Sequence, residues 1–165
     1  VKADAAEVVH KSDVGGVAVN LADETAVRAA VARMQSGISA AGLRFLVQKQ
    51  QPEGLEVILG AKAEDVGHLI MFGLGGVFVE VLKDVVFELT PVSDTEAADM
   101  LDGIQGAPLL KGVRGQTGVD RAALTELIQR LSRLVEDLPA IRELDLNPAL
   151  AYADGVVVVD GRISL

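Results

Sequence analysis

Apolar residues recur at helical spacing in one long segment near the end of the chain. Residues three and four positions apart lie on one side of an α-helix, so this spacing predicts an amphipathic helix whose apolar side faces a core. Thr117 is a candidate N-cap for it, because its side-chain oxygen can accept a bond from an unpaired backbone N–H. The apolar stripe consists of Leu124, Leu127, Ile128, Leu131, Leu134, Val135 and Leu138.

Two shorter helices are predicted, one from Asp23 to about Gln35 and one from Ser93 to about Gly103. Asp23 and Ser93 have the short polar side chains that N-caps favour. Glu96 stands three residues after Ser93, which completes a capping box. These local signals indicate where both helices begin.

Short apolar runs bounded by glycine, proline or polar residues predict strands between the helices. We expect the runs on either side of Pro52-Glu53-Gly54 to form an antiparallel pair with a wide turn. Residues 5–13 and 106–118 read as loops, the second carrying Lys111 and Arg114 among glycines. The expected strands are Val1–Ala3, Val17–Leu21, Leu43–Gln48, Leu55–Gly60, an apolar run into Gly73, and Val85–Val92. The pattern is mixed α+β, with helices packed on a largely antiparallel sheet.

The end of the chain predicts a β-hairpin. Asp154-Gly155 is a two-residue hairpin signal, and apolar residues flank it on both sides. A turn at these two residues places Asn147 opposite Arg162 and Ala149 opposite Asp160.

Three oxygen-bearing side chains converge in this expected hairpin. Side chains alternate across a strand, so Asp145 and Asn147 share one face. Asp160 would lie diagonal to Asn147 at about 7–8 Å between backbones, which is within side-chain reach. Carboxylate and amide oxygens suit Mg²⁺, which often completes its shell with water and substrate phosphates. The alternative is a surface hairpin with Asp and Asn in its turns.

Composition narrows the function classes. The 165 residues are half hydrophobic but only 3% aromatic, so a core of Val, Leu, Ile and Ala is expected. The net charge of -9 argues against nucleic acid as the main partner and against an acidic membrane surface. The absence of cysteine excludes disulfides and thiolate sites and suits a reducing compartment such as the cytoplasm. Neither a signal peptide nor an apolar run long enough to cross a bilayer is recognisable.

Two glycine-rich segments are candidate phosphate-binding loops. Gly15 and Gly16 precede an apolar run, and Gly73, Gly75 and Gly76 interrupt another. Bare backbone N–H groups at such positions can hold phosphate oxygens. The second segment is not a Walker A loop or a dinucleotide fingerprint, because no Gly-Lys-Ser/Thr follows it and no helix pattern opens after it. Ordinary turns and strand connections remain the alternative.

Six short motifs follow one another along nearly the whole chain. In this order they resemble the ATP-grasp domain of the ADP-forming acyl-CoA synthetases, in the branch that uses acetate and related acids. The resemblance implies an α+β ATP-grasp fold, partial at its N-terminus, in which two lobes hold ATP or ADP with Mg²⁺. The motifs are Val1-Lys2-Ala3, His10-Lys-Ser-Asp-Val-Gly-Gly16, Met71-Phe-Gly-Leu-Gly-Gly-Val-Phe-Val-Glu-Val-Leu-Lys-Asp84, Leu110-Lys-Gly-Val-Arg-Gly115, Leu144-Asp-Leu-Asn-Pro148 and Val159-Asp160.

The resemblance also implies roles for individual residues. Asn147 and Asp160 are similar to the family's Mg²⁺ ligands, with Asp145 near them. Glu56 is similar to its ribose-binding acid, and Lys2 to a strand lysine that contacts ATP phosphates. The family's lobe-joining hinge holds adenine by backbone groups and usually carries a glutamate where this chain has Gln48. The cofactor-binding residues implied are Lys2, Lys11, Gly15, Gly16, Val47, Gln48, Lys49, Gln50, Glu56, Gly75 and Gly76.

His10 and Arg114 are the implied catalytic residues. The histidine of the His-Lys-Ser/Thr-Asp motif resembles one that takes phosphate near the nucleotide. An imidazole can attack phosphorus in line while Mg²⁺ and lysine neutralise the oxygens. Arg114 stands between glycines and could fork onto phosphate with its permanent charge. The alternatives are a loop histidine that shapes the pocket and a solvated arginine, and His68 is expected to be structural.

The resemblance covers only part of an enzyme. It implies that the chain is one ATP-grasp domain, residues 1–165, of a longer protein whose CoA-binding and ligase domains or subunits are its partners. The fragment alone is therefore not expected to make acyl-CoA. An alternative parent is a protein lysine acetyltransferase, in which a synthetase-like region is regulatory. A relative of the succinyl-CoA ligases is disfavoured by the His10 motif and by Phe72–Gly76.

Overall fold

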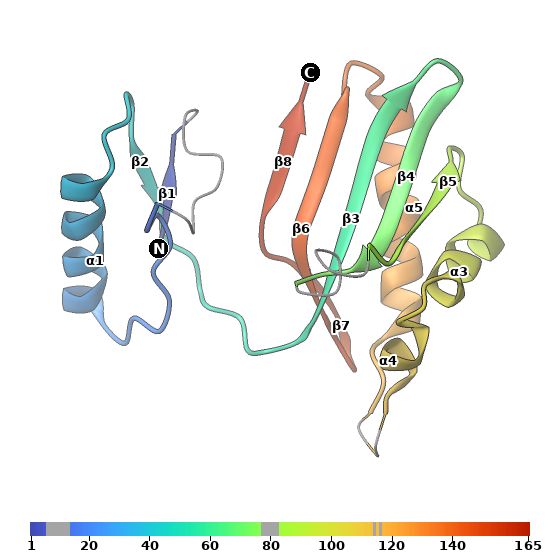
Figure 1. The fold of residues 1–165 in the computed structure, drawn as a ribbon, viewed down its shortest axis with the longest axis horizontal. Coiled ribbons are helices and arrows are strands. Elements are labelled where there is room, and N and C mark those ends of the chain that lie inside the picture. The colour runs from blue at the N-terminus through green and yellow to red at the C-terminus, as the bar shows by residue number, and fades with distance from the viewer. Residues whose placement is uncertain (6–13, 77–82, 114, 116) are drawn as a thin grey trace. The chain divides into compact units, whose positions relative to one another are not determined.

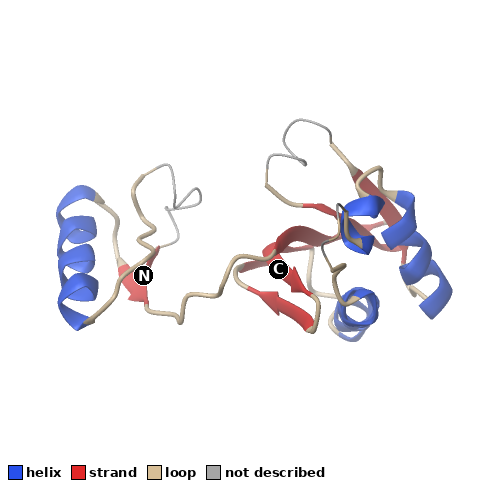
Figure 2. Cartoon of the chain, turned by 90° about the horizontal axis from the view of Figure 1, so that it is seen from below, coloured by secondary structure: helices blue, strands red, loops and turns tan. Residues whose placement is uncertain are grey.

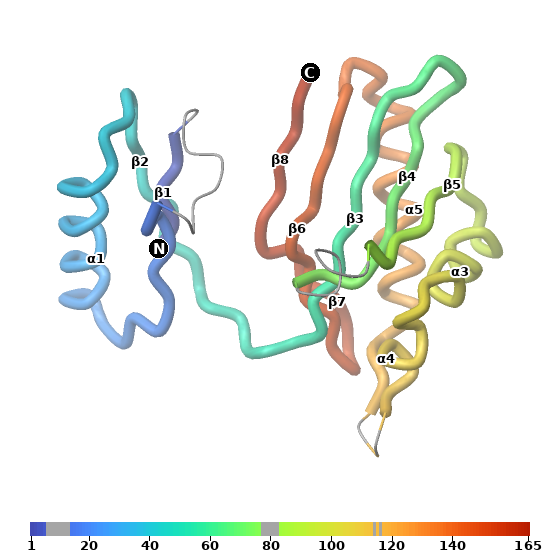
Figure 3. Tube along the Cα trace, in the orientation of Figure 1, coloured from blue at the N-terminus to red at the C-terminus, as the bar shows by residue number. Residues whose placement is uncertain are grey.

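The computed structural model describes residues 1–5, 14–76, 83–113, 115 and 117–165. The chain forms two compact units, Val1–Pro52 and Glu53–Leu165, and its path can be followed in Figure 3. His10, Lys11 and Arg114 lie outside the described residues, as do most of the expected 5–13 loop and residues 77–82 of the second glycine-rich segment.

The described residues of the first unit form two short strands and one helix (Figure 1). Strand β1 (Lys2–Asp4) pairs antiparallel with β2 (Arg44–Leu46), and helix α1 spans Glu24–Gly37. The predicted N-cap is confirmed, because the Asp23 side chain accepts a hydrogen bond from the Ala26 N–H at 2.8 Å. The expected strand 17–21 is wrong: it is reduced to one bridge at its first residue, since hydrogen bonds to residues 1–3 end at Ala18.

The second unit is built on a six-stranded antiparallel sheet. The path runs β5-β4-β3-β6-β7, and β8 also pairs with β6. The expected antiparallel pairing of the runs beside Pro52 is wrong, because β2 pairs with β1 whereas β3 pairs with β4 and β6. The strands are β3 (Leu55–Glu64), β4 (Gly67–Leu74), β5 (Val85–Leu89), β6 (Glu143–Tyr152), β7 (Gly155–Val158) and β8 (Gly161–Ser164).

Among the described residues of this unit, helices cover one face of the sheet (Figures 1 and 2). They are α3 (Asp94–Gly103), α4 (Ala107–Lys111) and α5 (Arg121–Asp137). The capping box of α3 is present as predicted. Two expectations are wrong: part of the 106–118 loop is the short helix α4, and Asp120 rather than Thr117 caps α5 by accepting from the Ala123 N–H.

The core lies between the helices and the covered face of the sheet. Its largest fully buried side chains include Phe72 and Leu59 from the strands and Leu124 and Ile128 from α5. The opposite face of the sheet carries no helix among the described residues (Figure 2). Within the part of the chain that the structure describes, no helix is long and apolar enough to cross a membrane.

The helix α5 offers a matched pair of leucines for testing this core. Leu124 is fully buried, whereas Leu134 is 38% exposed in the same helix. We expect Leu124→Ala to cost about 2–5 kcal/mol of unfolding free energy, because it removes buried methyl groups and leaves a cavity. Leu134→Ala should cost well under half as much. Urea unfolding of the two variants compares the costs, and equal losses would contradict the assigned helix face.

Candidate functional site

Strand β6 is paired along one edge by β8 and then by β7. Asp145 lies opposite Arg162 in the β8 pairing, and the β7 pairing has the same offset. Between the two pairings, the Asn147 N–H donates to the Asp160 carbonyl oxygen at 3.1 Å. Asn147 therefore lies opposite Asp160.

The predicted hairpin register is wrong by two residues. Tyr152 pairs with Gly155, so the connecting residues are 153 and 154 instead of the expected Asp154-Gly155. This shift brings Asp160 directly opposite Asn147 instead of diagonal to it, and Arg162 opposite Asp145. Two of the three predicted metal ligands are therefore direct cross-strand neighbours.

The other edge of β6 has an irregularity at the same point. Leu59 of β3 pairs with Leu146, but Val57 pairs with Ala149, so β6 has one extra residue between the two pairs. The extra residue falls in the Asn147-Pro148 segment, whose peptide bond is cis. Such bulges bend a strand and redirect side chains, and they are frequent beside functional sites.

Asp145 lies in an electrostatically unfavourable position for a carboxylate. Partial burial raises its pKa, the negative charges of Glu143 and Asp160 raise it further, and the Arg162 guanidinium opposes the rise. Negative charge is therefore concentrated on this part of β6, and the Arg162 guanidinium offsets it in part. The described residues contain no cluster of three or more His, Cys, Asp or Glu side chains suited to a metal. The candidate set combines two carboxylates with an amide oxygen, a donor set that Mg²⁺ accepts.

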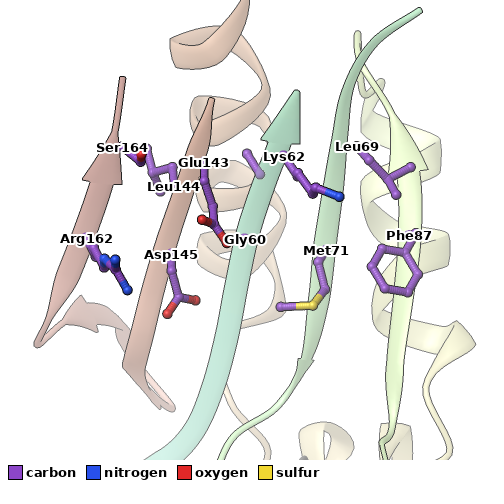
Figure 4. Close-up of a pocket in the computed structure, with 11 residues that line it drawn as sticks. Gly60, Lys62, Leu69, Met71, Phe87, Glu143, Leu144, Asp145, Arg162 and Ser164 are labelled. Carbon is purple, nitrogen blue, oxygen red and sulfur yellow. The ribbon is translucent and has the colours of Figure 1, made fainter. Parts of the chain in front are cut away.

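A shallow pocket of about 230 Å³ opens on the uncovered face of the sheet. Figure 4 shows Asp145, Arg162 and Met71 on this face, with Phe87 on the same face at the end of the pocket farthest from Arg162. Gly60 lies in its floor, where an added Cβ would approach the Met71 Cε to 3.3 Å. The lining residues are Gly60, Ala61, Lys62, Leu69, Met71, Phe87, Glu143, Leu144, Asp145, Arg162 and Ser164.

The structure brings Glu56 together with both glycines of the second segment that were predicted to bind cofactor. The Gly75 N–H donates to the Glu56 carbonyl oxygen at 2.8 Å. A Cβ at Gly75 would lie 3.0 Å from the Glu56 Cβ, and one at Gly76 would lie 3.0 Å from its Oε2. Glu56 is exposed. These glycines therefore allow the chain to pass closely over the acidic side chain.

The first unit holds the other described candidates. Lys2 lies in β1 opposite Leu46, and the next residue, Ala3, donates its N–H to the Gly16 carbonyl at 2.7 Å. Gly15 has a φ of 69°. The predicted hinge residues, Val47–Gln50, are all exposed. Lys2 and the first glycine pair therefore lie close together within this unit.

Two titratable side chains have structural roles. His68 is buried, and its Nε2 lies 2.8 Å from the Ile141 carbonyl oxygen, which agrees with the structural role predicted for it. Asp84 is also buried and accepts hydrogen bonds from the N–H groups of Gln105 and Gly106, each at 2.7 Å. The structural role of Asp84 was not predicted from the sequence, since an Asp before a strand is common in turns. Nor was Arg162 predicted to lie beside Asp145, where a correct register would have placed it.

Comparison with known proteins finds a matching family model and several similar enzymes. A family model described as an ATP-grasp domain matches residues 1–165. The chain is 42% identical to the ADP-forming 4-hydroxybutyrate–CoA ligase of Nitrosopumilus maritimus, covering 96% of this chain but 24% of the ligase. It is 36% identical to the β subunit of the ADP-forming acetate–CoA ligase I of Pyrococcus furiosus, covering 96% of this chain and 71% of that subunit. The chain thus spans about a quarter of the length of the 4-hydroxybutyrate–CoA ligase.

A solved structure from Ca. Korarchaeum cryptofilum has the same fold. This dinucleotide-forming acetyl-coenzyme A synthetase 1 superposes with a TM-score of 0.89 at 42% identity, covering all of this chain and 75% of that one. That structure is a complex with coenzyme A and Mg-AMPPCP, with a phosphohistidine segment pointing towards the nucleotide binding site. These relatives are ligases and synthetases, so they give no support to the acetyltransferase alternative.

The raised pKa of Asp145 predicts a pH-dependent effect on stability. Ionising this carboxyl costs folding free energy above its folded-state pKa, and the cost disappears below an unfolded-state pKa of about 3.9, where both states are protonated. We therefore expect Asp145→Asn to raise the Tm at pH 7 in magnesium-free buffer, and the gain to vanish towards pH 3. Scanning calorimetry with EDTA measures this.

The control for this prediction is Asp154→Asn, which removes the same charge from the exposed turn between β6 and β7. A gain that is as large in the control would show that net charge, rather than the surroundings of Asp145, is responsible. A loss of stability in Asp145→Asn at pH 7 would contradict the assignment.

Proposed function

Since the chain belongs to the ATP-grasp domains of the ADP-forming acyl-CoA synthetases, we propose that it is the part of such an enzyme that binds ATP or ADP with Mg²⁺. The parent enzyme would interconvert acyl-CoA, ADP and phosphate with a free acid, CoA and ATP. One observation carries the proposal: Asn147 lies opposite Asp160 beside the half-buried Asp145.

Asn147 and Asp160 would hold Mg²⁺, with Asp145 beside them. The observed donors fit this ion, because all of them are hard oxygens. A cation would also reduce the repulsion that Glu143 and Asp160 exert on the Asp145 carboxylate. When bound, Mg²⁺ neutralises phosphate oxygens during phosphoryl transfer. Arg162 lies opposite Asp145 and limits the repulsion while the ion is absent.

The nucleotide-binding roles proposed for individual residues are those that the family resemblance implies. Glu56 would bind the ribose, and Gly75 and Gly76, which pass closely over Glu56, would lie beside the same part of the ligand. Val47–Gln50 would hold adenine by their backbone. Lys2, Lys11, Gly15 and Gly16 would contact phosphates. A relative that was solved with Mg-AMPPCP supports this ligand class.

His10 would carry the phosphoryl group and Arg114 would stabilise it. An imidazole nitrogen attacks the γ-phosphorus of ATP, the bond to the bridging oxygen breaks, and ADP leaves with the electron pair. Arg114 offers a planar, permanently charged group to the phosphoryl oxygens. The acyl and CoA chemistry would take place on CoA-binding and ligase domains or subunits, which are the proposed partners.

The metal site can be tested by calorimetry on the full-length parent protein. We expect Asn147→Ala and Asp160→Ala each to weaken Mg·ATP binding by at least about tenfold, since each removes a direct oxygen ligand. Asp154→Ala, in the turn of the same strands, should bind as the wild type does. Unchanged affinity in both ligand variants would refute the proposed site.

The phosphoryl carrier can be tested by labelling the parent protein with [γ-³²P]ATP. We expect an acid-labile, base-stable label that is lost in His10→Ala, because an alanine offers no nitrogen to form the bond. His68→Asn, at the other histidine of this sequence, should keep the label. Full labelling of His10→Ala would rule out the relay.

A further inference from the structure

Two side-chain amides that are 30 residues apart in sequence hold each other in the first unit. The Asn20 N–H donates to Gln50 Oε1 at 2.6 Å, and Gln50 Nε2 donates to Asn20 Oδ1 at 2.8 Å. Asn20 has a φ of 57°, a left-handed conformation that asparagine adopts more readily than most residues. The backbone and side chain of Asn20 therefore act together as one docking point for Gln50.

This pairing changes what Gln50 can do at the hinge. Both polar atoms of its amide are engaged by Asn20, so the side chain is committed to the protein rather than to a ligand. The backbone of Val47–Gln50 is not engaged in the same way. Among the described residues, no backbone–backbone hydrogen bond of a turn or loop involves this segment. Its N–H and C=O groups are available to a planar base.

The chain is anchored again shortly after this segment. Gly54 lies against Tyr152, and an added Cβ would come within 2.7 Å of the ring carbon Cε1. The next residue, Leu55, is already paired with Ala151 in the sheet. Without the bonds to Asn20, the backbone of Val47–Gln50 would have more conformations to lose on binding.

We propose that Asn20 is a positioning residue for the nucleobase. By holding the Gln50 amide it orders the backbone of Val47–Gln50 before a ligand arrives, so that less ordering entropy is lost when the base binds. This inference rests on the proposed function, and it concerns only the part of the affinity that depends on the base. It assigns no direct ligand contact to the side chains of Asn20 or Gln50.

If Asn20 and Gln50 had a purely structural role, their loss would weaken the binding of every ligand alike. Two ligands distinguish this role from the positioning of the base. Mg·ATP carries the base, whereas Mg·tripolyphosphate carries only the phosphates. Gln50→Leu keeps the approximate size of the side chain and removes both hydrogen bonds. We expect it to weaken Mg·ATP binding by about fivefold to tenfold, the effect of losing two exposed hydrogen bonds. Its affinity for Mg·tripolyphosphate should remain within about twofold of the wild type.

The variants at position 20 and a neighbouring control refine the test. Asn20→Asp keeps the backbone donor and a side-chain acceptor, so it should retain wild-type ATP affinity. Asn20→Gly keeps the left-handed backbone but loses Oδ1, and should fall between the wild type and Gln50→Leu. Gln51→Leu makes the same change one residue along and should have no effect. Calorimetry, with competition for the weaker ligand, is carried out on the full-length parent protein.

The outcomes are distinct. A wild-type protein that binds no Mg·ATP would overturn the proposed function and this inference together. Wild-type binding with an unchanged Gln50→Leu, or with equal losses for both ligands, would overturn the inference and leave the proposed function standing.

Discussion

The pairing of β6 is the constraint on which the second unit depends. One edge of this strand pairs with β3 in the middle of the sheet, and the other edge pairs first with β8 and then with β7. Both edges are irregular near Asn147-Pro148: the register with β3 shifts there, and the partner on the opposite edge changes from β8 to β7. The candidate metal residues therefore lie where backbone geometry is dictated by two neighbours at once.

The two faces of the sheet have different tasks. One face packs against α3, α4 and α5 and forms the apolar core together with them. The other face carries Asp145, Glu143 and Arg162 around a shallow pocket. Burial and neighbouring acids raise the pKa of Asp145, so a bound cation would relieve a repulsion that the fold builds in. The apolar core on one face therefore offsets the electrostatic repulsion on the other.

Local signals in the sequence were sufficient for the helix starts and for the position of the final hairpin. Asp23 and the Ser93–Glu96 box cap helices as predicted, because a cap depends on residues within one turn. Non-local pairing was harder to predict. The hairpin register was wrong by two residues, because the structure uses residues 153 and 154 as its turn. The two hydrogen bonds between Asn20 and Gln50 join residues that are 30 positions apart, so no short sequence pattern predicts them. The strands β1 and β6, which pair with β2 and β3, are also distant from them in sequence, and these pairings were not predicted.

The central claim is that Asn147 and Asp160 share one divalent cation with the nucleotide phosphates. Anomalous X-ray scattering from crystals of the parent protein with Mn²⁺ and a non-hydrolysable ATP analogue locates the ion directly. The account predicts a peak within about 2.0–2.4 Å of the Asn147 Oδ1 and an Asp160 carboxylate oxygen, the range of hard-cation distances. A nucleotide bound with its Mn²⁺ peak away from both side chains would contradict it.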